Sequence, residues 1–164
     1  MPMLIVMVGF PGSGKTYQAG ILKKRKSFVH LCVNDFYKDG NSDSFNAVAE
    51  DDAYHRLGDE CKRLLKDGQS VICDAPFLTK HRRKSLLGRL KRIKGLRKIC
   101  VIVERSVPSC AEALSKDGRK NSKEILKKME KQYEEPRLEE GWTKILRINT
   151  EAVIKAKKRQ KKGE

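Results

Sequence analysis

The chain has 164 residues, of which 37 are Lys or Arg and 21 are Asp or Glu, so its formal net charge is +16. This length suits one domain with a single core. No apolar run approaches the ~18 residues that a membrane span needs, and the apolar segment 1–8 lacks the features of a signal peptide. We therefore expect a soluble protein of the cytoplasm, or of a host cytoplasm if the chain is viral, without a membrane partner.

The positive charge is concentrated in two stretches of the sequence. Residues 80–98 hold ten Lys or Arg among nineteen, and residues 155–162 hold six among eight. A small phosphorylated metabolite needs one or two arginines, whereas a polyanion gains affinity from every phosphate that is neutralised, because counterions are released. Nucleic acid, either DNA or RNA, is therefore the expected partner. The alternative is that the charge only keeps the surface solvated.

The first predicted element is a buried strand over residues 4–8, followed by a glycine loop and a helix over 15–24. The loop matches the pattern G-x-x-x-x-G-K-[ST], which surrounds a nucleotide phosphate with backbone N–H groups at the positive end of a helix. Lys15 is expected to reach the β- and γ-phosphates, and the Thr16 hydroxyl to bind Mg²⁺. The candidate residues for binding the cofactors ATP and Mg²⁺ through this loop are Gly9, Pro11, Gly12, Ser13, Gly14, Lys15 and Thr16.

A second apolar strand is predicted over residues 28–33, and Asp35 follows it directly. In a parallel sheet the carboxyl ends of the strands share one crevice, so this carboxylate is expected to face the glycine loop. There it could accept a proton from an attacking hydroxyl, or it could merely cap a turn. A polar loop at 40–44 and an amphipathic helix over 47–65, ended by Asp67-Gly68, come next.

The third strand, over residues 70–73, ends at Asp74. This is the place of a carboxylate that orients Mg²⁺ in phosphate-binding folds, although capping of the next loop is an alternative. A helix over 80–93 follows, with apolar residues on one face and basic residues on the other. Its basic stripe is a candidate contact for a phosphate backbone or simply a solvated face. The stripe consists of Arg82, Arg83, Arg89 and Arg92.

A fourth strand over residues 98–103 is followed by two helices, over 107–114 and 122–133. Arg119 lies in the loop between them, where a basic side chain could close over a triphosphate and stabilise charge in the transition state. Asn121 and Glu124 have the spacing of a capping box. A fifth strand over 144–148 completes an α/β fold, a parallel sheet with helices on both faces. The basic tail, 151–164, is expected to be a helical stub that frays into disorder.

These motifs occur in an order that resembles one known group. The glycine loop, Asn34-Asp35 with Tyr37, Asp74 before Arg82-Arg83, Gly118-Arg119 and Pro136…Glu140-Gly141-Trp142 are similar to the 5′-kinase domain of phage polynucleotide kinase and related small P-loop kinases, which include zeta toxins. The similarity spans about residues 1–149. It implies a kinase domain over 1–150, a helical lid over about 108–134 and the strand order 2-3-1-4-5.

The resemblance also implies roles for single residues. Lys15, Asp35 and Arg119 become the catalytic candidates, with Asp35 as general base on an acceptor 5′-hydroxyl and Arg119 as the lid arginine that touches the nucleotide. Thr16 and Asp74 become the metal candidates. In the resembled group an arginine usually holds the phosphate of the acceptor, and Lys38 occupies that position here. A lysine cannot make the bidentate contact with a phosphate that an arginine makes. Asp35, Lys38 and the arginine stripe of 80–93 are the candidate substrate-binding residues.

The sequence thus predicts an ATP- and Mg²⁺-dependent kinase of a nucleic-acid hydroxyl, with a 5′-OH end as the first choice of acceptor. One alternative keeps this chemistry on a hydroxymethylated base in DNA or on a small molecule. Another is a nucleotide-dependent nucleic-acid-binding module without phosphate transfer.

Overall fold

The computed structural model describes residues 1–38 and 46–163 of the chain. The polar loop predicted at 40–44 lies outside the described residues. The elements in chain order are β1 (Met3–Val8), α1 (Lys15–Arg25), β2 (Phe28–Cys32), the 3₁₀ turn η1 (Val33–Phe36), α2 (Ala47–Lys66), β3 (Ser70–Asp74), α3 (Lys80–Arg89), β4 (Arg97–Glu104), α4 (Val107–Lys116), α5 (Ser122–Gln132), η2 (Leu138–Glu140), β5 (Lys144–Asn149) and α6 (Thr150–Lys162).

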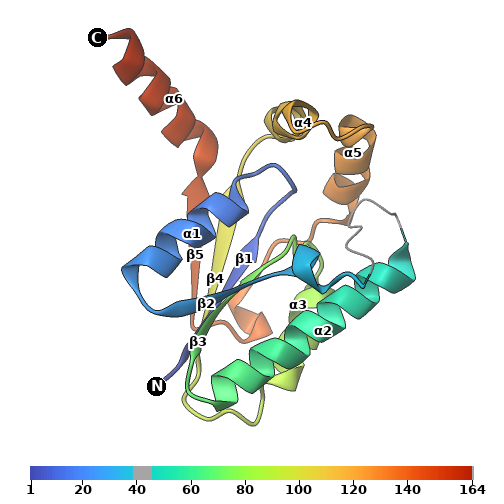
Figure 1. Cartoon of the computed structure of the whole chain (residues 1–164), viewed down its shortest axis with the longest axis vertical. Helices are drawn as coiled ribbons and strands as arrows, with labels where there is room; N and C mark the ends of the chain where they lie inside the picture. The colour runs from blue at the N-terminus through green and yellow to red at the C-terminus, as the bar shows by residue number, and fades with distance from the viewer. Residues whose placement is uncertain (39–45, 164) are drawn as a thin grey trace.

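The five strands form one parallel sheet in the order β2-β3-β1-β4-β5, which confirms both the predicted fold class and the predicted order (Figure 1). Strand β1 is central and buried on both faces, which explains why it is an unbroken apolar run. Alternate residues of β1 point to opposite faces of the sheet and belong to two separate hydrophobic cores. Leu4, Val6 and Val8 pack against α2 and α3, whereas Ile5 and Met7 pack against α1.

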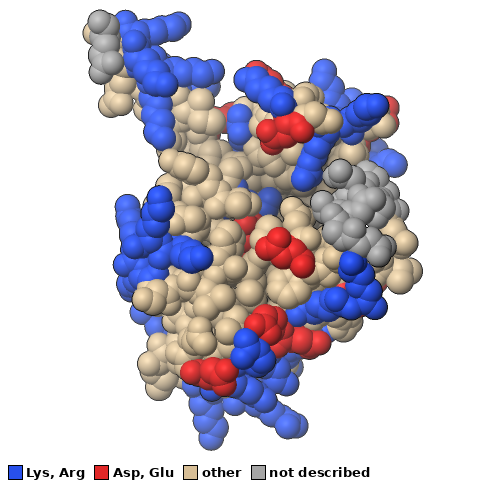
Figure 2. Space-filling model, in the orientation of Figure 1, with Lys and Arg blue, Asp and Glu red and all other residues tan. Residues whose placement is uncertain are grey.

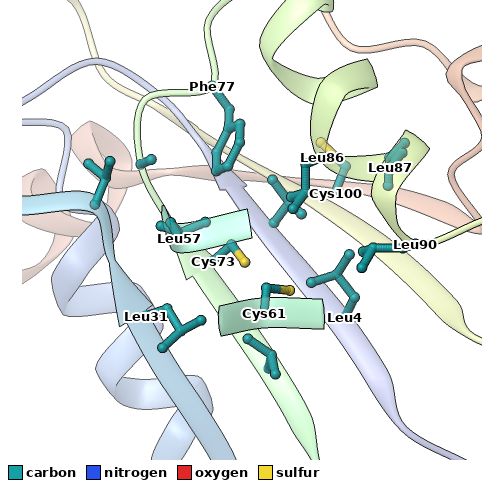
Figure 3. Close-up of a cluster of buried hydrophobic side chains, with 14 of the residues drawn as sticks. Leu4, Leu31, Leu57, Cys61, Cys73, Phe77, Leu86, Leu87, Leu90 and Cys100 are labelled. Atoms are coloured by element: carbon teal, nitrogen blue, oxygen red, sulfur yellow. The ribbon is translucent and has the colours of Figure 1, made fainter. Parts of the chain in front are cut away.

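The larger core lies between the sheet and the pair α2–α3. Leu57 and Cys61 of α2, Cys73 of β3 and Leu86 of α3 point into it (Figure 3). All five cysteines are free thiols, as the odd number and the lack of a C-x-x-C motif suggest. No helix within residues 1–38 and 46–163 has the length and the apolar character required to cross a bilayer.

Three predicted helix ends can be compared with the structure. Gly68 adopts φ +82° and ends α2, as predicted, because its left-handed conformation lets two N–H groups turn back to Leu65 and Leu64. Helix α3 ends at Arg89, before the predicted residue 93, so Arg92 lies in the turn that follows. The predicted capping box is wrong, since Asn121 has φ +59° and its side chain does not bond to the N-terminus of α5.

The predicted helix after residue 150 is present, but the predicted fraying is wrong, because helix α6 continues from Thr150 to Lys162. The Thr150 hydroxyl donates to the backbone oxygens of Ser13 and Glu104 at 2.9 and 3.1 Å, and Asn149 caps the first turn. These hydrogen bonds fix the start of α6. The later turns, from residue 155 onward, are helical although their side chains are exposed.

A buried ion pair connects α3 to η2, the turn that precedes β5. The Arg83 side chain is fully buried and donates to both carboxylate oxygens of Glu140 at 2.9 Å, and the Trp142 indole N–H donates to Glu140 at 3.0 Å. Burial alone would raise the pKa of Glu140, but the hydrogen bonds from Arg83 and Trp142 outweigh it and hold that pKa below its ordinary value.

We expect Glu140→Gln to lower the free energy of unfolding by about 3–5 kcal/mol, because it leaves the Arg83 charge buried without a counterion. Urea denaturation at neutral pH measures this loss. Because the pKa of Glu140 is depressed in the folded state, its contribution is present above the ordinary carboxyl pKa and disappears as pH falls through the folded value. The double variant Arg83→Met/Glu140→Leu should recover stability, and a stable Glu140→Gln single variant would contradict the pair's role.

Candidate active site

The glycine loop joins β1 to α1 at the carboxyl edge of the sheet. Gly12 and Gly14 have φ +81° and +95°, and a Cβ on Gly12 would lie 2.7 Å from the Cys110 backbone oxygen, so this backbone path requires glycine. The Ser13 hydroxyl is buried and has no hydrogen-bond partner within the part of the chain that the structure describes. An unpartnered buried hydroxyl beside the open N-terminus of α1 suits a phosphate oxygen.

Lys15 is positioned inside this loop. Its ammonium donates to the Phe10 backbone oxygen at 3.0 Å, and the side chain is 7% exposed. Burial lowers its pKa, and the nearby Asp74 carboxylate opposes this effect. An incoming phosphate would replace a weak carbonyl contact with a full counter-charge, so the arrangement fits a phosphate-binding lysine.

Asp74 ends β3 beside the first turn of α1, and it is 2% exposed. The Thr16 hydroxyl donates to its Oδ2 at 2.8 Å, and the His30 Nε2 lies 2.9 Å from the same oxygen. Burial would raise the pKa of Asp74, but the His30 hydrogen bond, the Lys15 charge and the Thr16 hydrogen bond together lower it, so the carboxylate stays ionised. A carboxylate and a hydroxyl in contact are hard oxygen donors, which is the set that Mg²⁺ prefers.

Asp35 lies in η1, directly after β2, and is exposed. Strands β2 and β3 are neighbours, and Cys32 at the end of β2 lies opposite Asp74 at the end of β3. Asp35 comes three residues after Cys32, so it follows the strand next to the one that ends at Asp74. Burial is the main reason that the pKa of the Cys32 thiol is raised, and the charges of Asp74, Asp35 and Lys15 all act on it. Three of the sequence-predicted groups therefore contribute charge at this edge of the sheet. Lys38 is exposed, at the end of the described segment 1–38.

Helices α4 and α5 pack on one another above the sheet and form the predicted lid (Figure 1). Arg119 is exposed in the loop between them, after Gly118 with φ +80°. Burial is the main cause that lowers the pKa of Lys15, and the Arg119 charge makes a smaller contribution in the same direction.

Two residues that sequence reasoning missed support the glycine loop from behind. Arg105, after β4, donates to the Gly12 backbone oxygen at 2.9 Å and to the Ser109 hydroxyl at 3.0 Å. Thr150, after β5, donates to the Ser13 backbone oxygen at 2.9 Å. Because these hydrogen bonds engage the carbonyls of Gly12 and Ser13, they stabilise the backbone of the loop, whose N–H groups are the expected phosphate contacts. The signal in the sequence is their place at strand ends, which becomes informative only once the strand order is known.

The arginine stripe of α3 needs a correction. Arg83 is not on a wet face but in the core, paired with Glu140, so it has no access to a phosphate backbone. Arg82 pairs with Asp51 at 2.6 Å and lies over the Tyr54 ring, and Arg89 pairs with Asp59. The acidic face of α2 thus neutralises most of the stripe. Arg92 is exposed in the turn after α3 and stays a predicted contact.

A glycine phosphate loop at the carboxyl edge of a parallel 2-3-1-4-5 sheet, covered by a two-helix lid, defines a P-loop kinase fold. The chain belongs to the AAA_33 family of AAA domains, whose sequence model matches residues 4–136. Membership of this P-loop family implies that the loop binds a nucleotide. No curated protein sequence matches the chain.

Several solved structures share the fold. A presumed kinase from Chloroflexus aurantiacus has a TM-score of 0.71 at 19% identity, over 99% of this chain and 97% of that one. A gluconokinase from Sinorhizobium meliloti has a TM-score of 0.63 at 15% identity, over 90% and 81%. A chain of the Pnkp1/Rnl/Hen1 RNA repair complex has a TM-score of 0.67 at 21% identity, over 80% of this chain and 43% of that one.

Proposed function

We propose that this protein transfers the γ-phosphate of ATP to a hydroxyl of a nucleic acid, with a 5′-OH end as the acceptor. The observation that carries the proposal is that Lys15, the Thr16–Asp74 pair and Asp35 all lie at the carboxyl edge of the sheet. The two helices joined by the loop that bears Arg119 pack against Phe10 of the glycine loop at the same edge. A switch would need only the nucleotide-binding half of this set. A carboxylate beside the phosphate loop is what a transferase adds.

In the proposed reaction the acceptor oxygen attacks the γ-phosphorus while its proton passes to the Asp35 carboxylate. The bond from the γ-phosphorus to the β,γ-bridging oxygen breaks, and ADP leaves. Lys15 and the loop N–H groups hold the phosphates in line, and Arg119 stabilises charge on the moving group. Thr16 and Asp74 would hold Mg²⁺, which neutralises charge on the β- and γ-oxygens when it is bound.

The charge of the chain supports a polymeric acceptor, since +16 exceeds what one small phosphorylated molecule requires. The gluconokinase that shares the fold acts on a small hydroxyl compound by its name, so a small-molecule acceptor is the second candidate.

Transfer of label from [γ-³²P]ATP to a panel of acceptors tests the proposal. The panel contains 5′-OH DNA, 5′-OH RNA, hydroxymethylated duplex DNA and free nucleosides. We expect 5′-OH ends to be labelled fastest. Labelling confined to nucleosides would favour the small-molecule reaction, and slow ATP hydrolysis that no acceptor accelerates would favour a switch or binding module.

Arg119→Lys tests the lid. We expect kcat to stay clearly below wild type, because a point charge on a flexible stem does not reproduce the planar two-pronged contact of arginine with phosphoryl oxygens. Steady-state kinetics at saturating ATP measure the effect. The neighbouring Lys120→Gln is the matched control, since it removes one exposed charge from the same loop. A fully active Arg119→Lys variant, or a larger loss of kcat in Lys120→Gln, would show that Arg119 contributes only positive charge and no specific contact with the phosphoryl group.

A further inference from the structure

Helix α6 projects from the carboxyl edge of the sheet, the same edge that holds the glycine loop and the lid (Figure 1). Thr150 is its one buried residue among those described, and positions 155–163 are all exposed. The helix has ~20 Å of length at 1.5 Å per residue. Because α6 contributes so little to the core, packing does not explain its amino-acid composition.

The exposed surface of α6 is basic, and Glu151, one turn before Lys155, is the only acidic residue of the helix. Its basic residues are Lys155, Lys157, Lys158, Arg159, Lys161 and Lys162, which we call the α6 basic set. Figure 2 shows Lys and Arg side chains in blue along the projecting arm. None of them forms a salt bridge with another residue of 1–38 or 46–163, whereas three arginines of α3 each do. Lys157 approaches the Tyr17 ring at 5.7 Å.

The α6 basic set also repels itself. Lys155 and Arg159, Lys157 and Lys161, and Lys158 and Lys162 are three like-charged pairs at i,i+4. Each such pair costs an isolated helix about 0.2–0.5 kcal/mol. A row of phosphates would relieve this repulsion, because each anion can lie between two cations.

The composition of α6 distinguishes a nucleic acid from other occupants. A helix that lies on a membrane needs a broad apolar face with large side chains, and after Ile154 this helix has none. A second copy of a chain with charge +16 would add repulsion. A polyanion with evenly spaced charges is the partner whose chemistry complements the arm.

We infer that α6, rather than the arginine stripe of α3, is the main docking arm for the phosphate backbone of a nucleic acid. The inference rests on the proposed function for the role of the bound strand, but the binding itself does not require phosphate transfer. The contacts are with phosphates, so α6 positions the strand and does not read its bases.

The test is fluorescence anisotropy of the full chain with labelled oligonucleotides that carry a 5′-phosphate, without ATP. Such strands bind the arm but offer no 5′-OH, so the result is independent of transfer. The α6 variant changes Lys157, Lys158, Lys161 and Lys162 to Gln, a good helix former. The matched control changes Lys23, Lys24, Arg25 and Lys26 to Gln at the exposed C-terminal end of α1, with the same loss of charge.

We expect the α6 variant to raise Kd at least about tenfold and to reduce the slope of log K against log salt by about 2 to 3, for DNA and RNA of any sequence. The control should change Kd less than about threefold. Equal losses in both variants, or no binding by the wild-type chain, would overturn the inference. Binding to vesicles of anionic phospholipid is measured in parallel by sedimentation. If the α6 variant loses vesicle binding but keeps its affinity for oligonucleotides, the inference is also overturned. If α6-dependent binding holds while no 5′-OH end is phosphorylated, the inference survives and the proposed function fails.

Discussion

Replacing Lys15 by alanine should lower kcat by several powers of ten, the largest effect expected of any single change. The ammonium is positioned by the Phe10 backbone oxygen inside the glycine loop, where charge develops on the moving phosphoryl group. Initial rates with saturating ATP and acceptor measure the loss. A variant that keeps more than about a tenth of wild-type kcat would contradict this role.

The same substitution should leave the fold intact. Burial lowers the pKa of Lys15, so its charge is held at a cost, and removing it should leave the melting temperature of the apoprotein unchanged or slightly raised. Lys24→Ala, at the exposed end of α1, is the control for the loss of one lysine and should retain full activity. A large drop in melting temperature for Lys15→Ala would attribute lost activity to unfolding.

Asp35→Asn should lower kcat by roughly 10²–10⁴ while the Kd for ATP stays near wild type, because the amide has the same shape but takes no proton. Asp35 is exposed in η1, directly after β2, and takes no part in the hydrogen bond between Thr16 and the buried Asp74. Pre-steady-state rates of phosphate transfer, together with nucleotide titration, separate the two effects.

Asp67→Asn is the control for this change, since Asp67 is an exposed carboxylate at the far end of α2. It should leave both quantities unchanged. If Asp35→Asn abolishes ATP binding yet keeps its rate at saturation, Asp35 is a structural residue or a metal ligand instead of a base.

The sequence was sufficient to predict the sheet and the core of the site, because both depend on local signals. Unbroken apolar runs mark strands that are covered on both faces, and a glycine loop of this pattern between a strand and a helix is specific to phosphate binding. Asp74 follows from the same logic, since carboxyl ends of parallel strands meet at one edge.

The remaining site residues depend on pairings between distant segments, which a local pattern does not specify. His30 interrupts the apolar run of β2, but its contact with Asp74 becomes predictable only when β2 and β3 are known neighbours. Arg83 has the helical spacing of the apolar face, since it precedes Leu86 and Leu87 by three and four residues, but its charge led to the prediction of a solvated position. The position of Glu140, 57 residues further along the chain, provides the buried counterion. For α6, basic composition suggested a frayed tail, while the anchor at Thr150 came from contacts with Ser13 and Glu104.

The most direct test of the central claim compares two oligonucleotides that are identical except at one end. One carries a 5′-hydroxyl and the other a 5′-phosphate, and each is incubated with the wild-type protein and [γ-³²P]ATP. The account predicts label on the 5′ end of the first strand only, with ADP formed in equal amount. Equal labelling of both strands, or ADP release that neither strand accelerates, would contradict it.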